Sequence, residues 1–161
     1  MPSGLYVIGS RAELDGRLRW NLMTANLVVQ VATDPKLVAA AVESASLTCR
    51  LVESGGCFSV NMVARDDREL VRRFVKPLPV VDVTCDQHGE VTALAGHPVT
   101  VAETGAPILD RAPAWLDCRV RERLPLGSHT LFVGTVVGFG GPTGEIPPLL
   151  RMEDTRMNYG G

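Results

Sequence analysis

The stretch that decides the fold reads NLMTANLVVQVATDPKLVAAAVESASLTCRLVESGGCFSVN and spans residues 21–61. Apolar runs, one helical apolar face and an alternating segment follow one another in it, which predicts strands around a single helix. The predicted elements are strands at 27–32, 37–42 and 57–63 and a helix at 46–53. Asp34-Pro35 is a turn signal between the first two strands, and Gly55-Gly56 supplies a stop for the helix.

Three hydroxyl side chains crowd the start of the predicted helix: Ser44, Ser46 and Thr48. Several backbone N–H groups at a helix N-terminus have no intrahelical partner, and the helix dipole adds partial positive charge there. Together these features favour binding of a phosphate monoester. Helix capping by Ser44 or Ser46 is the alternative, but a cap needs only one residue. Three hydroxyls exceed that need, so the residues favour a ligand.

Other polar residues are less specific. Thr24 and Asn26 lie two apart and share one face of a strand that could run alongside such a ligand. Taken alone, this spacing is more typical of an ordinary polar outer face. Asn61, within an apolar strand, is expected to form hydrogen bonds in the core. His129 follows a Gly-Ser pair and could contact a reduced cofactor or a nicotinamide, although its spacing alone favours a surface-turn histidine.

The rest of the chain predicts a mainly β protein. Hydrophobic residues make up 45% of the 161 residues and aromatic residues only 5%, so Val, Leu and Ala fill the interior. The 16 Gly and 11 Pro imply many turns, which suits a closed or split barrel. A second helix is predicted at 66–76, opened by a capping box of Asp66 and Glu69. Further strands are predicted at 4–10, 18–23, 80–84, 91–95, 99–103, 115–123 and 130–139.

Charge and cysteine content argue against several classes of function. The formal net charge is −2 with no basic stripe, so a nucleic-acid partner is not expected. The four cysteines form no C-x-x-C pair and no His stands at ligand spacing, so no metal site is expected. Cys49, Cys57 and Cys118 lie among apolar residues and are expected to be buried thiols rather than disulfides. With neither a signal peptide nor a membrane-spanning run, the sequence predicts a reduced, cytoplasmic protein.

Common catalytic motifs do not occur. The chain contains no G-x-G-x-x-G, P-loop or G-x-S-x-G pattern. Classical dinucleotide-binding, ATPase and hydrolase functions therefore lose their main support. An enzyme built on this sequence needs a bound cofactor to supply its chemistry.

Taken in order along the chain, the motifs resemble those of the flavin reductase-like family of the FMN-binding split-barrel fold. They are GLYVIGS, NLMTAN, VATDP, SASLT, ESGGCFSVN, AWLDCRV and GSHTLFVGTV, and they span nearly the whole chain. Each motif is weak alone, but their order and spacing together are specific. The resemblance implies one domain over residues 1–161, a six-stranded Greek-key split β-barrel with two or more short helices, and pairing into a homodimer.

The resemblance also implies a flavin site. The isoalloxazine is expected against Met23, Thr24, Ala25 and Asn26, and the phosphate at Ser44, Ser46 and Thr48. His129 matches the histidine of the family's Gly-Asp-His motif and is the expected catalytic residue, near the flavin and the nicotinamide. The motif reads Gly-Ser-His here, which leaves the Asp carboxylate without a counterpart. Arg73 or Lys76 is the candidate for a second phosphate-side element.

The implied activity is that of an NAD(P)H-dependent flavin reductase with FMN, or else FAD, as the bound flavin. NADH or NADPH delivers hydride to the flavin, and electrons pass on to oxygen, a partner monooxygenase or another acceptor. Three alternatives stay open: an FMN electron carrier without nicotinamide activity, a relative that binds deazaflavin or pyridoxal phosphate, and a non-catalytic barrel dimer.

The C-terminal residues 150–161 match no motif. Tyr159 could reach the site of a dimer partner, although a frayed tail is favoured.

Overall fold

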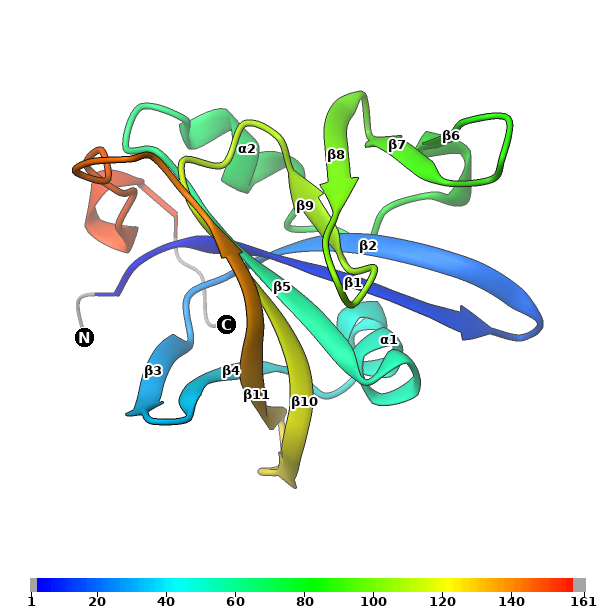
Figure 1. Cartoon of the computed structure of the whole chain (residues 1–161), viewed down its shortest axis with the longest axis horizontal. Helices are drawn as coiled ribbons and strands as arrows, with labels where there is room; N and C mark the ends of the chain where they lie inside the picture. Colours follow the sequence, from blue (N-terminus) through cyan, green and yellow to red (C-terminus); the bar gives the residue numbers. More distant parts are fainter. Residues whose placement is uncertain (1–2, 158–161) are drawn as a thin grey trace.

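The computed structural model describes residues 3–157, and most of their regular structure is β (Figure 1). The largest unit within this range is an antiparallel seven-stranded sheet of order β2-β1-β5-β10-β11-β4-β3. Its strands are β1 Tyr6–Leu14, β2 Arg17–Ala25, β3 Val28–Thr33, β4 Lys36–Glu43, β5 Cys57–Met62, β10 Trp115–Pro125 and β11 His129–Gly140. The mainly β class is therefore confirmed. The sheet has one strand more than the six that the resemblance implied.

Closure of the sheet follows from its connectivity. β2 and β3 form the two edges of the sheet, yet only Asn26 and Leu27 separate them in sequence. The sheet must therefore bend until its edges approach each other at this corner, which gives a split barrel. The barrel interior is filled by apolar side chains from several strands, among them Ile8, Ala25, Phe58, Val60 and Phe132.

A second layer packs on the outside of β1 and β2 (Figure 1). It contains a four-stranded sheet of order β6-β7-β8-β9 and the helix α2. The bounds are β6 Val83–Cys85, β7 Val91–Leu94, β8 His97–Val101, β9 Pro107–Leu109, α2 Arg68–Arg73 and the 3₁₀ helix η1 Val80–Asp82. Because side chains alternate along a strand, β2 directs Leu22 into this second core and Ala25 into the barrel. One strand thereby supports both cores.

Helix α1 (Leu47–Gly55) connects β4 to β5 and packs against β1 and β2. Its N-cap is Ser46, and its C-cap is Gly56, whose φ of 67° lies in the left-handed region. Glycine suits this conformation because it has no Cβ, and its N–H donates to the Val52 carbonyl at 2.9 Å. The predicted glycine stop is thus confirmed.

Two local predictions are wrong. Helix α2 begins at Arg68, and the side chain of its N-cap Asp67 makes no capping hydrogen bond. The predicted box of Asp66 and Glu69 does not form, because Asp66 lies one residue before the N-cap. The Asp67 carboxylate pairs with the Nε of Arg111 at 2.8 Å. The predicted strand at 80–84 begins as the η1 turn, and only Val83–Cys85 is extended.

The expected roles of Asn61 and the cysteines are confirmed. The Nδ2 of Asn61 donates to the Val7 carbonyl at 3.0 Å, and its Oδ1 accepts from the Leu109 amide at 2.8 Å. Asn61 thereby joins β5 to β1 and β9 inside the core. The cysteines carry free thiols, three of them buried and one exposed: Cys49, Cys57, Cys118 and, at the surface, Cys85.

The segment after β11 packs back on the large sheet. Leu149 forms a β-bridge with Ala64, and Arg151 forms one with Gly4. Leu150 between them is fully buried. The segment therefore fills the space between the start of β1 and the end of β5.

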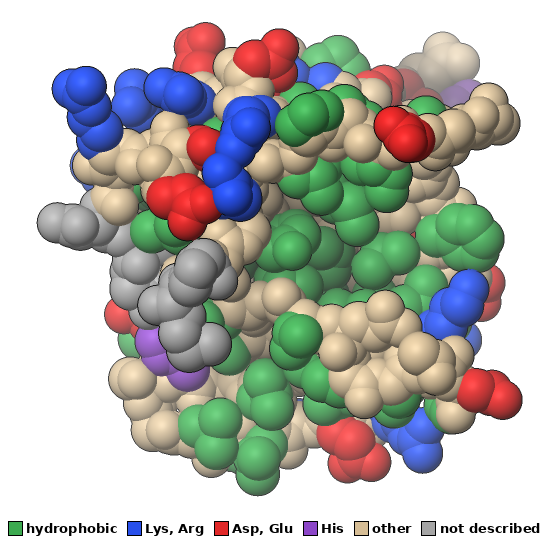
Figure 2. Space-filling model, turned by 90° about the vertical axis from the view of Figure 1, so that its left-hand side faces the viewer, with side chains coloured by type: hydrophobic (Ala, Val, Ile, Leu, Met, Phe, Trp, Pro, Cys, Tyr) green, Lys and Arg blue, Asp and Glu red, His purple; other side chains and the backbone are tan. Residues whose placement is uncertain are grey.

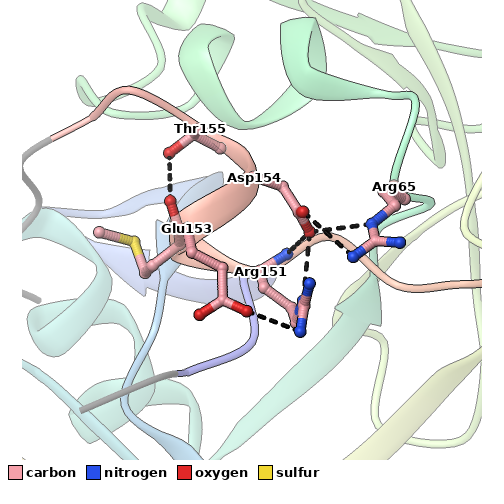
Figure 3. A network of polar contacts seen from close by, with 6 residues as sticks. Arg65, Arg151, Glu153, Asp154 and Thr155 are labelled. Carbon is pink, nitrogen blue, oxygen red and sulfur yellow. Dashed lines mark hydrogen bonds and ion pairs between the residues drawn. The ribbon is translucent and has the colours of Figure 1, made fainter.

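A polar network holds the following 3₁₀ helix η2 (Met152–Asp154) in place (Figure 3). The Asp154 carboxylate accepts from the Nε of Arg65 at 3.2 Å and from the amide of Arg151 at 3.0 Å. The C-terminal segment, for which the sequence offered no role, thus has a structural one. Tyr159 lies outside the described residues. None of the helices within residues 3–157 is long and apolar enough to cross a membrane.

Candidate functional site

Three segments that are far apart in sequence meet around the end of β4. On one side, the Ala41 amide donates to the carbonyl of Leu27, at the β2–β3 corner, at 2.9 Å. On the other side, Glu43 is paired in register with His129 at the start of β11. Two strand spacings of about 4.8 Å separate β3 from β11, and Ala41 and Glu43 are two residues apart, each with a rise of about 3.3 Å. The corner and His129 are therefore separated by roughly 12 Å. The structure thus brings together residues 23–26, 44–48 and 127–129.

Ser44 joins the end of β4 to the turn before β11. Its N–H donates to the carbonyl of Ser128 at 2.8 Å, and its Oγ donates to the carbonyl of Gly127 at 3.0 Å. The same Oγ lies 3.0 Å from the Oγ1 of Thr130. Ser44 therefore fixes the turn that carries His129 against the segment that leads into α1.

The start of α1 offers unpaired donors. The Oγ of Ser46 caps the helix by accepting from the Cys49 amide at 3.0 Å. Within the described part of the chain, the amides of Leu47 and Thr48 have no hydrogen-bond acceptor. The first turn of α1 contains no acidic residue. Free N–H groups at the positive end of a helix dipole suit a phosphate.

Two of the expected site hydroxyls point into the protein. Thr48 is fully buried, and its Oγ1 accepts from the Nδ2 of Asn21 at 3.0 Å. Thr24 is fully buried as well, and its Oγ1 donates to the Val71 carbonyl of α2 at 2.6 Å. An external ligand at these two positions meets the backbone rather than the hydroxyls.

Two polar atoms at this place are buried and have no hydrogen-bond partner among residues 3–157: the Oδ1 of Asn26 and the Nε2 of His129. Buried polar atoms are almost always hydrogen-bonded, so both atoms are available to bond a ligand. The other ring nitrogen of His129, Nδ1, is held by the Oγ of Ser128 at 2.9 Å. On β2, directly before Asn26, Ala25 is buried and Met23 is half-buried, and both pack in the barrel core.

The donors and acceptors present fit a phosphorylated flavin. The polar edge of an isoalloxazine carries carbonyl and imide groups, which Asn26 and His129 can bond. The amides at the start of α1 and the half-buried hydroxyls of Ser44 and Ser46 can bond a phosphate. Arg73 pairs with Asp82 at 3.0 Å, which uses its charge away from α1.

Asn21 is a buried polar residue that the sequence motifs do not single out. Its amide is 2% exposed and donates to Thr48, while its Oδ1 accepts from the Leu78 amide at 2.9 Å. The signal that could have found it is a polar residue directly between two large apolar residues, Trp20 and Leu22.

A large apolar cavity opens at the opposite end of β4. Its volume is about 750 Å³, and its lining includes Tyr6, Val28, Leu37, Trp115, Val136 and Phe139. Figure 2, which views the side of β3 and of the loop after β11, shows hydrophobic side chains gathered around a hollow. Val29 on β3 and Phe139 on β11 are 60% and 69% exposed. This face differs from the polar site at the other end of the strand.

The split barrel and its donor set define a flavin-binding protein of the split-barrel class. Within that class, the chain belongs to the flavin reductase-like family, since the model described as "Flavin reductase like domain" matches residues 1–160. The family assignment makes the chain an oxidoreductase of the flavin reductase type.

Individual relatives are distant. The chain is 28% identical to the NADH-dependent flavin reductase StyB of Pseudomonas fluorescens over 149 residues, which cover 92% of this chain and 78% of the relative. It is 28% identical to the high molecular weight rubredoxin of Moorella thermoacetica over 135 residues, 83% of this chain. The chain spans about half, 53%, of the length of that rubredoxin.

A solved structure shares the fold. The styrene monooxygenase flavin reductase SMOB of Pseudomonas putida S12 superposes with a TM-score of 0.69 and 25% identity, and the match covers 94% of this chain and 86% of SMOB. The split-barrel fold is therefore confirmed.

Proposed function

We propose that the chain is an NAD(P)H-dependent flavin reductase that binds FMN at the end of β4. The observation that carries the proposal is that two orphaned buried atoms, Asn26 Oδ1 and His129 Nε2, and the free amides at the start of α1 all lie around the end of β4. FMN is favoured over FAD because one helix start with adjoining hydroxyls suits a phosphate monoester. The similarity to StyB, named as a flavin reductase, supports the activity.

The roles of the residues follow from their positions. The amides of Leu47 and Thr48 and the hydroxyls of Ser44 and Ser46 hold the phosphate. The backbone of residues 23–26 and the side chain of Asn26 hold the ring. Thr24 and Thr48 act through the backbone they fix, since their hydroxyls bond inward.

His129 is proposed as the residue at the reacting end of the site. A bound flavin supplies the chemistry, because it accepts hydride from a nicotinamide and passes electrons on. The Ser128 hydroxyl holds Nδ1, so Nε2 is free to bond the flavin or the nicotinamide. Ser128 thereby orients the ring at the position where relatives carry Asp. The protein contributes orientation and the exclusion of water.

A homodimer is proposed from the apolar face. The cavity of about 750 Å³ and the exposed Val29 and Phe139 form a hydrophobic surface on β3, β4 and β11. Large contiguous apolar surfaces on a folded chain usually mark an interface. We propose a second copy of the chain as the occupant.

Three further assignments belong to the same proposal. Residues 1–161 form one domain, which is supported by β2 contributing to both cores. Free thiols fit a reducing, cytoplasmic location. The electron acceptor is oxygen or a partner monooxygenase, as the printed name of SMOB indicates for that protein.

Steady-state oxidation of NADH and NADPH, each with FMN and FAD, tests the activity. We expect nicotinamide oxidation that depends on added flavin and is faster with FMN. No oxidation with any of the four pairs would contradict the reductase proposal.

An FMN electron carrier is the second candidate, and the similarity to a rubredoxin favours it. The carrier binds FMN but oxidises neither nicotinamide, and its flavin is reduced by a chemical reductant. Titration of the apoprotein with FMN shows binding for both candidates, whereas the oxidation assay gives activity only for the reductase.

A further inference from the structure

Asn21 connects three parts of the molecule: strand β2, helix α1 and the segment after α2. It lies on β2 and is 2% exposed. Its Nδ2 donates to Thr48, the second residue of α1, at 3.0 Å. Its Oδ1 accepts from the amide of Leu78, in the segment after α2, at 2.9 Å.

The Asn21 amide donates to the Thr48 hydroxyl and accepts from the Leu78 backbone, so an apolar side chain at this position satisfies neither partner. Loss of the amide leaves the buried backbone N–H of Leu78 without its acceptor. One side chain thereby supports two buried contacts.

The two ends of the proposed flavin site sit on the two elements that Asn21 links. The ring end is formed by residues 23–26, which continue β2 directly. The phosphate end is formed by the first turn of α1, where the amides of Leu47 and Thr48 are free. The chain between these ends runs through β3 and β4, and the bond from Asn21 to Thr48 links them directly across the fold.

We propose that Asn21 is a positioning residue that sets the first turn of α1 at the correct distance from the ring strand. This inference rests on the proposed function. It makes Asn21 responsible for the preference for a phosphorylated flavin over riboflavin, although Asn21 touches neither. The ring contacts on β2 do not depend on the link, whereas the phosphate contacts on α1 do.

Equilibrium binding of FMN and of riboflavin to the apoprotein tests the proposal without any turnover. We expect Asn21→Ala to weaken FMN binding by about tenfold, the effect of roughly one lost hydrogen bond to a charged group. Riboflavin binding is expected to change by less than about twofold. Thr48→Val cuts the same link from the other side and should reproduce the effect, while Thr48→Ser should restore FMN binding.

Asn61→Ala is the matched control. Asn61 is also a buried amide with backbone partners, but its hydrogen bonds within residues 3–157 go to β1, β5 and β9 and none goes to α1. It should lower the melting temperature and leave the ratio of FMN to riboflavin affinity unchanged.

The outcomes are distinct. Equal weakening of both flavins by Asn21→Ala, or a ratio unchanged as in Asn61→Ala, would overturn the positioning role. If Asn21→Ala does not fold, Thr48→Val decides, because it keeps Asn21 bonded to Leu78. A wild-type protein that binds neither flavin overturns the proposed function itself.

Discussion

The thiols illustrate how burial sets the behaviour of single residues. Burial raises the pKa of Cys49 and Cys57, and it raises the pKa of Cys118 to about 12. A thiol with a raised pKa carries little thiolate at neutral pH and reacts slowly. We therefore predict that a thiol reagent at pH 8 labels Cys85 alone in the native protein and labels all four cysteines after unfolding. Mass spectrometry of the labelled peptides checks this, and rapid labelling of native Cys118 would contradict it.

Ser46 should have two separable effects. Ser46→Ala removes the cap on the Cys49 amide, which should lower the free energy of unfolding by about 1 kcal/mol. The same change should weaken FMN binding, because the hydroxyl and the adjoining amides form the proposed phosphate site. Ser54→Ala is the control, since Ser54 lies in the same helix and bonds the Glu13 carbonyl at 3.1 Å. Chemical denaturation and FMN titration measure both effects, and equal FMN affinity in the two variants would argue for a capping role only.

For single residues, the sequence predicts which polar side chains belong to the candidate site but not which partners their hydroxyls bond. Ser46 caps α1, Ser44 bonds the turn before β11, and the Oδ1 of Asn26 is buried with no partner among residues 3–157. The hydroxyls of Thr24 and Thr48 bond inward, to partners 47 and 27 residues away. Such partners are set by tertiary packing, which local spacing does not contain.

At the scale of elements, strong periodicity predicts well and local capping rules do not. The strands around residues 27–42 and 57–63 are recovered, as is the glycine end of α1. The capping box of Asp66 and Glu69 fails because α2 begins at Arg68 with Asp67 as its N-cap, which leaves Asp66 outside the cap position. The role of the C-terminal segment depends on the ends of β1 and β5, so no local pattern indicates it.

The C-terminal segment should respond to acid. Hydrogen bonds from Arg65, with those from Arg151, lower the pKa of Asp154 to about 2. A carboxyl whose pKa is lower in the folded state contributes stability above its unfolded pKa of about 3.9 and loses it as the pH falls through about 2. We predict that Asp154→Asn removes the part of the acid destabilisation that falls between about pH 4 and pH 2. Melting temperatures across this range check it; identical pH dependence in both proteins would contradict it.

For the whole molecule, residue patterns predict a barrel but do not distinguish a closed barrel from a split one. The distinction depends on β2 and β3 being opposite edges of one sheet, which local patterns do not contain. The family resemblance supplied that choice, and the connectivity through Asn26 and Leu27 explains it.

The apolar face leads to a prediction about assembly. Sedimentation equilibrium should give twice the 17.3 kDa mass of one chain. Val29→Lys places a charge on the exposed face of β3 and should shift the protein towards the monomer, because burying an unpaired charge is costly. Val81→Lys, at an exposed valine outside this face, is the control and should leave the mass unchanged. A monomeric wild type at all concentrations would contradict the proposed dimer.

The most direct test of the account is an FMN titration of the apoprotein, followed by the visible difference spectrum. The wild type should bind one FMN per chain, and Asn26→Ala should bind it at least about fivefold more weakly because one buried hydrogen bond to the ring is lost. A wild type that binds no FMN, or an Asn26→Ala variant with unchanged affinity, would contradict a flavin site at the end of β4.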